Sequence, residues 1–245
     1  MKTKDIVRGK KLYTGKANVL YEVVGYPFLV ELESTDNISA QNGLKRSNVK
    51  GKGLTNNTIS TILFKLFNEN NIPTHFVCEG LNSCSKVIKK AKMIRLEVIG
   101  RFIAAGSFCK RYNVDKGTVF ENMTFELSYK DDDLGDPFVS ESAAAYGLKV
   151  VNDFEDINRI KDLTYQIGKI AQAFFAEFGL TLVDFKVEFG YDEETGTVIL
   201  CDEFSPDTCR LWDKNGNSFD KDVFRNDTGD VEATYRRILE KIQSK

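Results

Sequence analysis

Two hydrophobic patterns recur along the chain, one with a period of two residues and one with the period of an α-helix. Residues 183–189 (VDFKVEF) alternate between apolar and charged side chains, which predicts a strand with one face turned to a core. A polar turn at 191–197 and a second strand at 198–204 complete a predicted hairpin. Residues 153–178 carry apolar side chains every three or four positions, which predicts a long helix closed by Gly179. Because this helix leads directly into the hairpin, we expect it to cover the back of the sheet.

The first hundred residues show the same patterns in shorter segments. Two strands are predicted within 11–23, a third at 28–32 and three more within 74–100, and an amphipathic helix is predicted at 55–70. Together they suggest an antiparallel β lobe with one helix packed on it. The polar stretch 33–53 holds three glycines and four basic residues, so it is either a flexible connection or a loop that closes on phosphates.

Composition narrows the class of protein without naming a function. The chain has 245 residues, 42% of them hydrophobic and 29% charged, with a net charge of −2, so no nucleic-acid partner is expected. Because the chain starts with charged residues, we expect no secretory signal. Because it has no long apolar run, we expect no membrane partner. Five cysteines without a C-x-x-C motif suggest reduced thiols and a cytoplasmic location. The one histidine, His75, reads as structural, which leaves acid–base chemistry to carboxylates and lysines.

The predicted hairpin gathers the strongest candidate chemistry. Its charged face carries an acid, a base and an acid, and the second strand brings two further acids: Asp184, Lys186, Glu188, Asp202 and Glu203. Carboxylate oxygens suit a divalent cation, and an ammonium group suits a polyphosphate. The alternative is a solvated strand face on which Lys186 neutralises its neighbours. The loop that follows favours a site, because it contains Arg210, a residue that binds anions with two donors at once.

Three other segments are weaker candidates. The bend at Gly15–Lys16 is not a Walker A loop, because Ala17 stands where a hydroxyl is needed and a strand pattern follows. It could be a hairpin that covers a nucleotide triphosphate or an ordinary surface hairpin. Arg101 with the small residues at 104–107 suits either a phosphate monoester or a tightly packed helix. The acidic turn that starts at residue 131 is either a cation site or simply solvated.

Seven segments in order along nearly the whole chain resemble the phosphoribosylaminoimidazole-succinocarboxamide synthase (SAICAR synthetase) family: KLYTGKA at 11–17, ESTDNISAQNG at 33–43, GKG with NN at 51–57, AAGS at 104–107, VDFKVEFG at 183–190, DEFSPDTCRLWD at 202–213 and DKDVFR at 220–225. The resemblance implies an α+β, ATP-grasp-like fold of two lobes with ATP between them. A small antiparallel β lobe related to the kinase N-lobe would span residues 1–97, and a larger α+β lobe would span 98–245. A homodimer is also implied.

The resemblance further implies a reaction. The family joins L-aspartate to the carboxylate of carboxyaminoimidazole ribonucleotide (CAIR) with ATP, forming SAICAR, ADP and phosphate in de novo purine biosynthesis. A carboxylate is a poor electrophile, so ATP first converts it to an acyl phosphate that the amine of aspartate attacks. Such a transfer needs charge neutralisation and alignment more than a strong base.

By resemblance, each candidate residue receives a role. Glu188 and Asp202 would hold Mg²⁺ on the triphosphate. Lys186 would neutralise the CAIR carboxylate or the transferring phosphoryl group. Asp184 would orient the imidazole amine. The remaining roles are binding ones: Arg101, Ser107 and Arg210 for the CAIR phosphate, Gly15, Lys16 and Ala17 for the ATP phosphates, Glu97 for adenine or ribose, and Ser39 of the 36–43 loop with Arg225 for closure over the substrates. Arg210 belongs with Lys186 and Asp184 in the catalytic set.

Two positions depart from the family pattern, and two other classes of function remain open. Asn18 stands where the family often has a lysine, and Phe102 stands where many members have asparagine. One alternative is a small-molecule kinase on a related scaffold, although H-R-D and D-F-G motifs are absent from the sequence. The other is a nucleotide-binding module without turnover, which would not need a metal pair beside a lysine.

Overall fold

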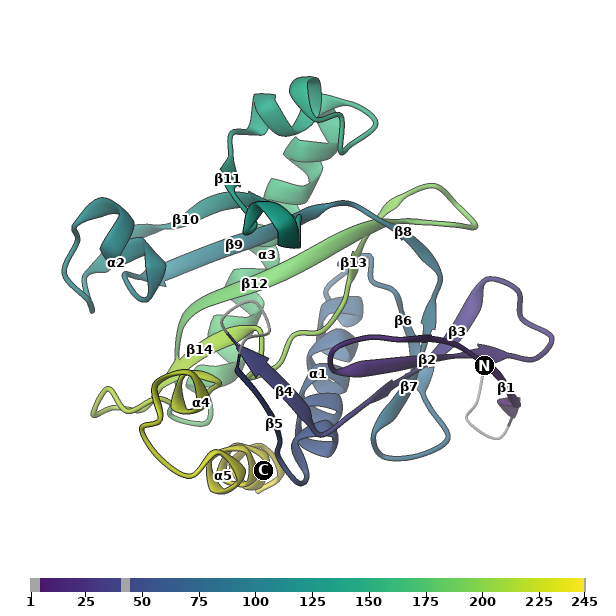
Figure 1. Ribbon diagram of the computed structural model, residues 1–245, viewed down its shortest axis with the longest axis horizontal. Coiled ribbons are helices and arrows are strands. Elements are labelled where there is room, and N and C mark those ends of the chain that lie inside the picture. The colour runs from purple at the N-terminus through teal and green to yellow at the C-terminus, as the bar shows by residue number, and fades with distance from the viewer. Residues whose placement is uncertain (1–4, 41–44, 245) are drawn as a thin grey trace.

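The computed structural model describes residues 5–40 and 45–244, and it shows two large antiparallel sheets with helices packed against them, together with a small sheet of two strands (Figure 1). The elements of the first part of the chain are β1 (Arg8–Thr14), β2 (Asn18–Val23), β3 (Leu29–Ser34), β4 (Asn37–Ala40), β5 (Lys45–Asn48), α1 (Lys52–Glu69), β6 (Phe76–Glu79), β7 (Ser85–Lys89), β8 (Ala91–Met93) and β9 (Leu96–Ile103). The later elements are α2 (Ser107–Tyr112), β10 (Val119–Tyr129), β11 (Phe138–Val139), α3 (Phe154–Ala176), β12 (Thr181–Asp192), β13 (Val198–Cys201), β14 (Cys209–Trp212), α4 (Asp222–Asn226) and α5 (Val231–Gln243).

The first sheet has the strand order β1-β2-β3-β7-β6, with α1 packed against it. This confirms the predicted antiparallel β unit with one helix. The helix begins at Lys52, a few residues before the predicted start. Gly51, in a left-handed conformation, is its N-cap residue. Of the three strands predicted within 74–100, the middle one divides into β7, which stays in the first sheet, and β8, which pairs with β12. The last of the three, β9, also belongs to the second sheet.

The second sheet is built around β12, the longest strand. Along one edge, β12 pairs first with β9 and, nearer its end, with β8. Along the other edge, it pairs first with β14 and, nearer its end, with β13. The ladders with β13 and β14 leave a gap at Lys186 and Val187, where the amide of Lys186 donates to the carbonyl of Thr208 at 2.7 Å. The segment between β13 and β14 therefore bulges out of the sheet at this point.

The predicted second strand of the hairpin is shorter than expected. The interpretation of 198–204 as a strand is wrong beyond Cys201, because Asp202 adopts a left-handed backbone with φ of 58°. This turn directs residues 202–208 away from the sheet. It also changes which side chains can share a face with Lys186, since Asp202 is placed by a turn and not by strand alternation.

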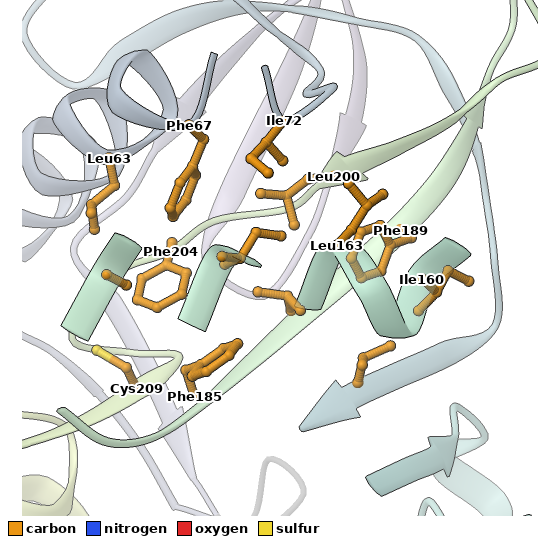
Figure 2. Close-up of a cluster of buried hydrophobic side chains, with 14 of the residues drawn as sticks. Leu63, Phe67, Ile72, Ile160, Leu163, Phe185, Phe189, Leu200, Phe204 and Cys209 are labelled. Carbon is orange, nitrogen blue, oxygen red and sulfur yellow. The ribbon is translucent and has the colours of Figure 1, made fainter. Parts of the chain in front are cut away.

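The predicted long helix α3 covers one face of this sheet (Figure 1). Its end follows the Schellman pattern, in which the Leu180 amide donates to the carbonyl of Phe175 and Gly179 has φ of 67°. Side chains from α1, α3 and β12 meet in one core, with Leu63 and Phe67 facing Phe185 and Phe204 (Figure 2). This core covers one face of α1 and one face of β12. The other face of β12 can therefore carry charged groups.

The prediction for His75 as a structural residue is confirmed. The ring is 2% exposed and lies 4.9 Å from the ring of Phe64, and Nε2 has no hydrogen-bond partner in the described part of the chain. Burial, with a contribution from the charge of Lys86, lowers the pKa of His75 from 6.5 to about 3. The ring is therefore neutral at neutral pH.

We expect this neutral ring to make the fold sensitive to mild acid. Above pH 6.5 the stability is complete, and it is lost as the pH falls towards the folded pKa of about 3, because only the unfolded chain takes up the proton. Between about pH 7.5 and about pH 5, wild type should lose about 2 kcal/mol more unfolding free energy than His75→Gln. Urea unfolding at the two pH values measures this difference, and equal losses would contradict it.

Several further features bear on the earlier expectations. All five cysteines are free thiols. No helix within the described residues is long and apolar enough to cross a bilayer. The proposed boundary between residues 97 and 98 falls inside β9, which belongs to the second sheet, and the division into two lobes stays a prediction.

Candidate active site

A cavity of about 1250 Å³ lies between the two sheets. Apolar side chains of the first sheet line one end, among them Val30, Leu32 and Ile88. The charged face of the second sheet lines the middle, and the 202–208 segment reaches it from the gap between β13 and β14. A pocket with an apolar end and a charged centre suits a ligand that has a flat ring and an ionic tail.

The centre of the cavity is a network of lysines and carboxylates. Nζ of Lys186 lies 2.9 Å from Glu97 and 3.1 Å from Glu188. Nζ of Lys130 contacts both oxygens of Glu188, at 2.7 and 2.6 Å. Burial alone would lower the pKa of Lys186, but the charges of Glu188, Asp202 and Glu97 outweigh it and raise this pKa. Lys186 is thus a permanently charged ammonium in a site of opposite charge, as the sequence predicted.

Asp202 completes this network from the turn after β13. Burial and the charge of Glu188 raise the pKa of Asp202 to about 7, whereas Lys186 opposes the rise. Glu188 shows the reverse balance, since Lys186 and Lys130 overcome its burial and lower its pKa. Asp202 makes no side-chain hydrogen bond with any described residue, so its oxygens are open to a ligand.

The pair Glu188 and Asp202 fits a Mg²⁺ ion that also binds phosphates. No three His, Cys, Asp or Glu side chains within residues 5–40 and 45–244 form a closed metal cage. Mg²⁺ is commonly held by one or two carboxylates together with substrate phosphates and water, so two carboxylates on one wall of the cavity suffice. A metal held by the protein alone is not required by this geometry.

A second charged group surrounds Asp184 at the start of β12. Nη1 of Arg210 lies 2.7 Å from Asp184, and Arg101 also donates to the same carboxylate oxygen. Nε of Arg210 contacts Asp222 at 2.8 Å, and Nε of Arg101 contacts Glu126 at 2.9 Å. The two predicted phosphate-binding arginines are therefore brought together, and each already holds carboxylates of the protein.

Ser107 accepts a hydrogen bond from Arg111 at 3.4 Å, and the glycine before it packs against Arg210. A Cβ atom on Gly106 would lie 2.5 Å from Nη2 of Arg210, and Gly106 also has φ of 58°, so a larger residue would displace the arginine. Ser107 follows directly as the first residue of α2. The interpretation of the 104–107 segment as a helix packed through its alanines is wrong, because the two buried alanines follow β9 and the short helix begins only after the glycine. The interpretation as a phosphate-monoester site stays a prediction.

Arg101, Ser107, Asp184 and Arg210 are not among the described residues that line the cavity, whereas the other predicted binding residues do line it. They come from the β1–β2 turn, from β4, from β9 and from α4: Gly15, Lys16, Ala17, Ser39, Glu97 and Arg225. Lys16 reaches across to Asp132 of the acidic turn at 3.1 Å. The 36–43 loop predicted to close over the substrates is described only to residue 40, where it forms β4, and its residues 41–43 lie outside the described residues.

Sequence reasoning missed several residues of the cavity. Lys130, which holds Glu188, stands at the end of β10 without a motif around it. Lys52 pairs with Asp207 at 2.9 Å across 155 positions of sequence, and Lys221 lines the cavity beside them. In the acidic turn, Asp131 pairs with Arg95 and Asp132 pairs with Lys16, so these two carboxylates form ion pairs that the sequence did not indicate. Only the DKDVFR segment carried a signal that could have directed attention to Lys221.

Comparison with known proteins adds independent information. The family model described as SAICAR synthetase matches residues 11–242. Phosphoribosylaminoimidazole-succinocarboxamide synthase of Streptococcus pyogenes serotype M3 (strain ATCC BAA-595 / MGAS315) is 43% identical over 231 residues, which cover 94% of this chain and 97% of the relative.

Solved structures agree with these matches. A SAICAR synthetase (Type-2) in complex with ADP superposes with a TM-score of 0.89 at 37% identity, covering 96% of this chain and 98% of that chain. The synthase of Ehrlichia chaffeensis superposes with a TM-score of 0.90 at 37% identity and the same coverage. Sequence and structure comparisons therefore point to the same family.

Proposed function

The chain belongs to the SAICAR synthetase family, and we propose how its cavity performs the reaction of that family. It is an ATP-dependent ligase of purine biosynthesis that joins L-aspartate to the carboxylate of CAIR, and the kinase alternative is not favoured. The single observation that carries the proposed mechanism is the placement of Lys186, Glu188 and Asp202 together on one wall of the cavity.

The reaction divides into two balanced steps. In the first, a carboxylate oxygen of CAIR attacks the γ-phosphorus of ATP, the bond to the β-phosphate oxygen breaks and ADP leaves. In the second, the amine nitrogen of L-aspartate attacks the acyl carbon, the bond to the phosphate oxygen breaks, phosphate leaves and the amine loses a proton to solvent. Lys186 serves the first step, because its charge offsets the repulsion between a carboxylate and a triphosphate.

Glu188 and Asp202 are the residues that would hold Mg²⁺. The ion would neutralise the phosphate oxygens and help to align them with the acceptor. Lys130 donates to both oxygens of Glu188, and we expect it to exchange this partner for a phosphate group when ATP and the metal bind. Glu97 orients Lys186 from the neighbouring strand β9, and it stands where a nucleotide ribose would pass on the way to the apolar end of the cavity.

The phosphate of CAIR is proposed to lie against Arg210, Ser107 and Arg101. A guanidinium has five N–H donors, so Arg210 keeps donors free after its bonds to Asp184 and Asp222. Arg101 is 3% exposed and donates to Asp184 and Glu126, so its first role is to support Asp184, and its contact with the CAIR phosphate stays a prediction. Asp184 is thereby fixed in orientation, as a residue that must accept a bond from the imidazole amine should be. Gly15, Lys16 and Ala17 would cover the ATP phosphates from the β1–β2 turn.

The experiment that tests the function measures ADP release with magnesium and ATP, with CAIR and L-aspartate added singly and together. We expect release to need both compounds and to accompany a new succinocarboxamide product. Release with CAIR alone would indicate the acyl-phosphate half-reaction or a kinase. If neither compound stimulates release and a panel of alcohols does, the ligase assignment is wrong. The homodimer and the cytoplasmic location stay predictions.

A further inference from the structure

We propose that Lys86 is a positioning residue that holds, from behind the wall of the cavity, the turn carrying Asp202. This inference rests on the proposed function, because that function makes the turn a place for Mg²⁺. Lys86 lies on β7, opposite Leu32 of β3 and two positions before Ile88. Leu32 and Ile88 line the cavity, whereas Lys86 is not among the described residues that do. The lysine therefore stands beside the cavity without opening onto it.

The ammonium group of Lys86 is enclosed between the first sheet and α1. The residue is 1% exposed. Its Nζ donates to Oγ of Ser60 at 2.6 Å and lies 5.3 Å from the centre of the Phe64 ring, and both of these residues belong to α1. Among the described residues, Ser60 is the only hydrogen-bond partner of this Nζ, and no carboxylate forms an ion pair with it. The helix thus holds a buried cation through one neutral hydroxyl.

Packing alone does not account for a lysine at this position. A buried ammonium group with one neutral partner is costly, and an apolar side chain of similar length would fill the same space without that cost. Burial lowers the pKa of Lys86 to about 8, whereas the charges of Glu203 and Asp202 act to raise it, so the group stays mostly charged at neutral pH. The charges that compensate Lys86 therefore belong to the two acids that follow β13.

A hydrogen-bonded connection joins Lys86 to the same turn. Oγ of Ser60 also accepts from the amide of Phe204, at 3.4 Å. Asp202 lies outside β13 and has a left-handed backbone, so the strand ladder does not hold it. The Phe204 side chain is fully buried in the core. Residues 202–204 are thus fixed from behind, by the core at one end and by the charge of Lys86 along the turn.

The place of Lys86 distinguishes it from the other cations near Asp202. Lys186 and Lys130 line the cavity, where the phosphates of a bound nucleotide would attract them. Lys86 does not meet those phosphates from behind the wall, so its charge stays with Asp202 when the substrates bind. A carboxylate that is oriented before the metal arrives needs less reorganisation to bind it. We therefore expect Lys86 to act on metal binding and not on the organic substrates.

The test measures how much Mg²⁺ strengthens the binding of ADP. Calorimetry at pH 7 gives the dissociation constant for ADP with and without Mg²⁺, and the ratio of the two is the readout. In Lys86→Met we expect this ratio to shrink about 10-fold, and the Mg²⁺ concentration for half-maximal turnover to rise by a similar factor, the loss typical when the support of a metal ligand is removed. KM for CAIR and for L-aspartate should stay within about threefold of wild type.

Unfolding by urea separates this role from a structural one. The unfolding free energy of Lys86→Met should equal or exceed that of wild type, because an apolar chain of similar length replaces a buried charge. Ser60→Ala keeps the charge and removes the connection, so it should also shrink the ratio, and it serves as the second variant should Lys86→Met fold poorly. An unchanged ratio in either folded variant would overturn the inference.

Lys92→Met is the matched control, because Lys92 is an exposed lysine of the neighbouring strand β8 and is not among the described residues that line the cavity. Its ADP ratio and its Mg²⁺ requirement should equal those of wild type. If wild type forms no succinocarboxamide product, the proposed function itself has failed and this inference fails with it. If wild type forms the product and Lys86→Met needs no more Mg²⁺, only the inference fails.

Discussion

Replacing Lys186 by alanine is expected to lower kcat about 10³-fold or more while ATP still binds. Lys186 is the only cation whose Nζ contacts both Glu97 and Glu188 among the described residues. The neighbouring carboxylates keep its ammonium charged at any working pH. A charge held in place before the reaction stabilises the transferring phosphoryl group without reorganisation, and its removal costs about 4 kcal/mol of barrier at this fold-change.

Two measurements separate this chemical role from a structural one. Single-turnover formation of the succinocarboxamide product should fall, whereas the dissociation constant for ATP, measured by calorimetry, should change by less than about tenfold. Lys161→Ala is the control, because Lys161 forms a comparable ion pair with Glu141 at 2.6 Å outside the cavity. Turnover in Lys186→Ala within tenfold of wild type would remove Lys186 from the mechanism.

The charged face of β12 could be predicted because strand alternation is a local rule. Asp184, Lys186 and Glu188 stand on one face in the sequence pattern and in the structure, and the apolar residues between them enter the core. The long helix α3 was predictable for the same reason, since its periodic apolar stripe and its closing glycine lie within one continuous segment.

The end of β13 and the partners of the site could not be read in this way. Asp202 lies outside β13 because the edge of β12 that pairs with β13 pairs with β14 over its earlier residues. That change of partner depends on β14, which comes later in the chain. Lys130 meets Glu188 across 58 positions and Lys52 meets Asp207 across 155. Pairs of this kind depend on how distant elements pack, and each lysine alone looks like a surface charge.

Replacing Lys52 by methionine is expected to lower the unfolding free energy by about 3–5 kcal/mol, the cost typical of removing one partner of a buried ion pair. The side chains of Lys52 and Asp207 are 1% and 6% exposed, and their charged atoms lie 2.9 Å apart. Burial would raise the pKa of Asp207, but the charges of Lys52 and Lys221 lower it, so the acid is ionised in the folded protein. Without Lys52 this ionised carboxylate keeps only the hydroxyl of Tyr235 as a bonded partner.

Denaturant unfolding measures this loss, and a double-mutant cycle assigns its cause. Lys65→Met is the matched control on the same helix, because Lys65 pairs with Glu79 at the surface and should contribute at most about 1 kcal/mol. Lys52→Met combined with Asp207→Leu should be less destabilising than the sum of the two single changes, since both charges then leave together. Additive losses would show that the two residues stabilise the fold independently. Coupled losses would mean that α1, the 202–208 segment and α5 are held together at one buried charge pair.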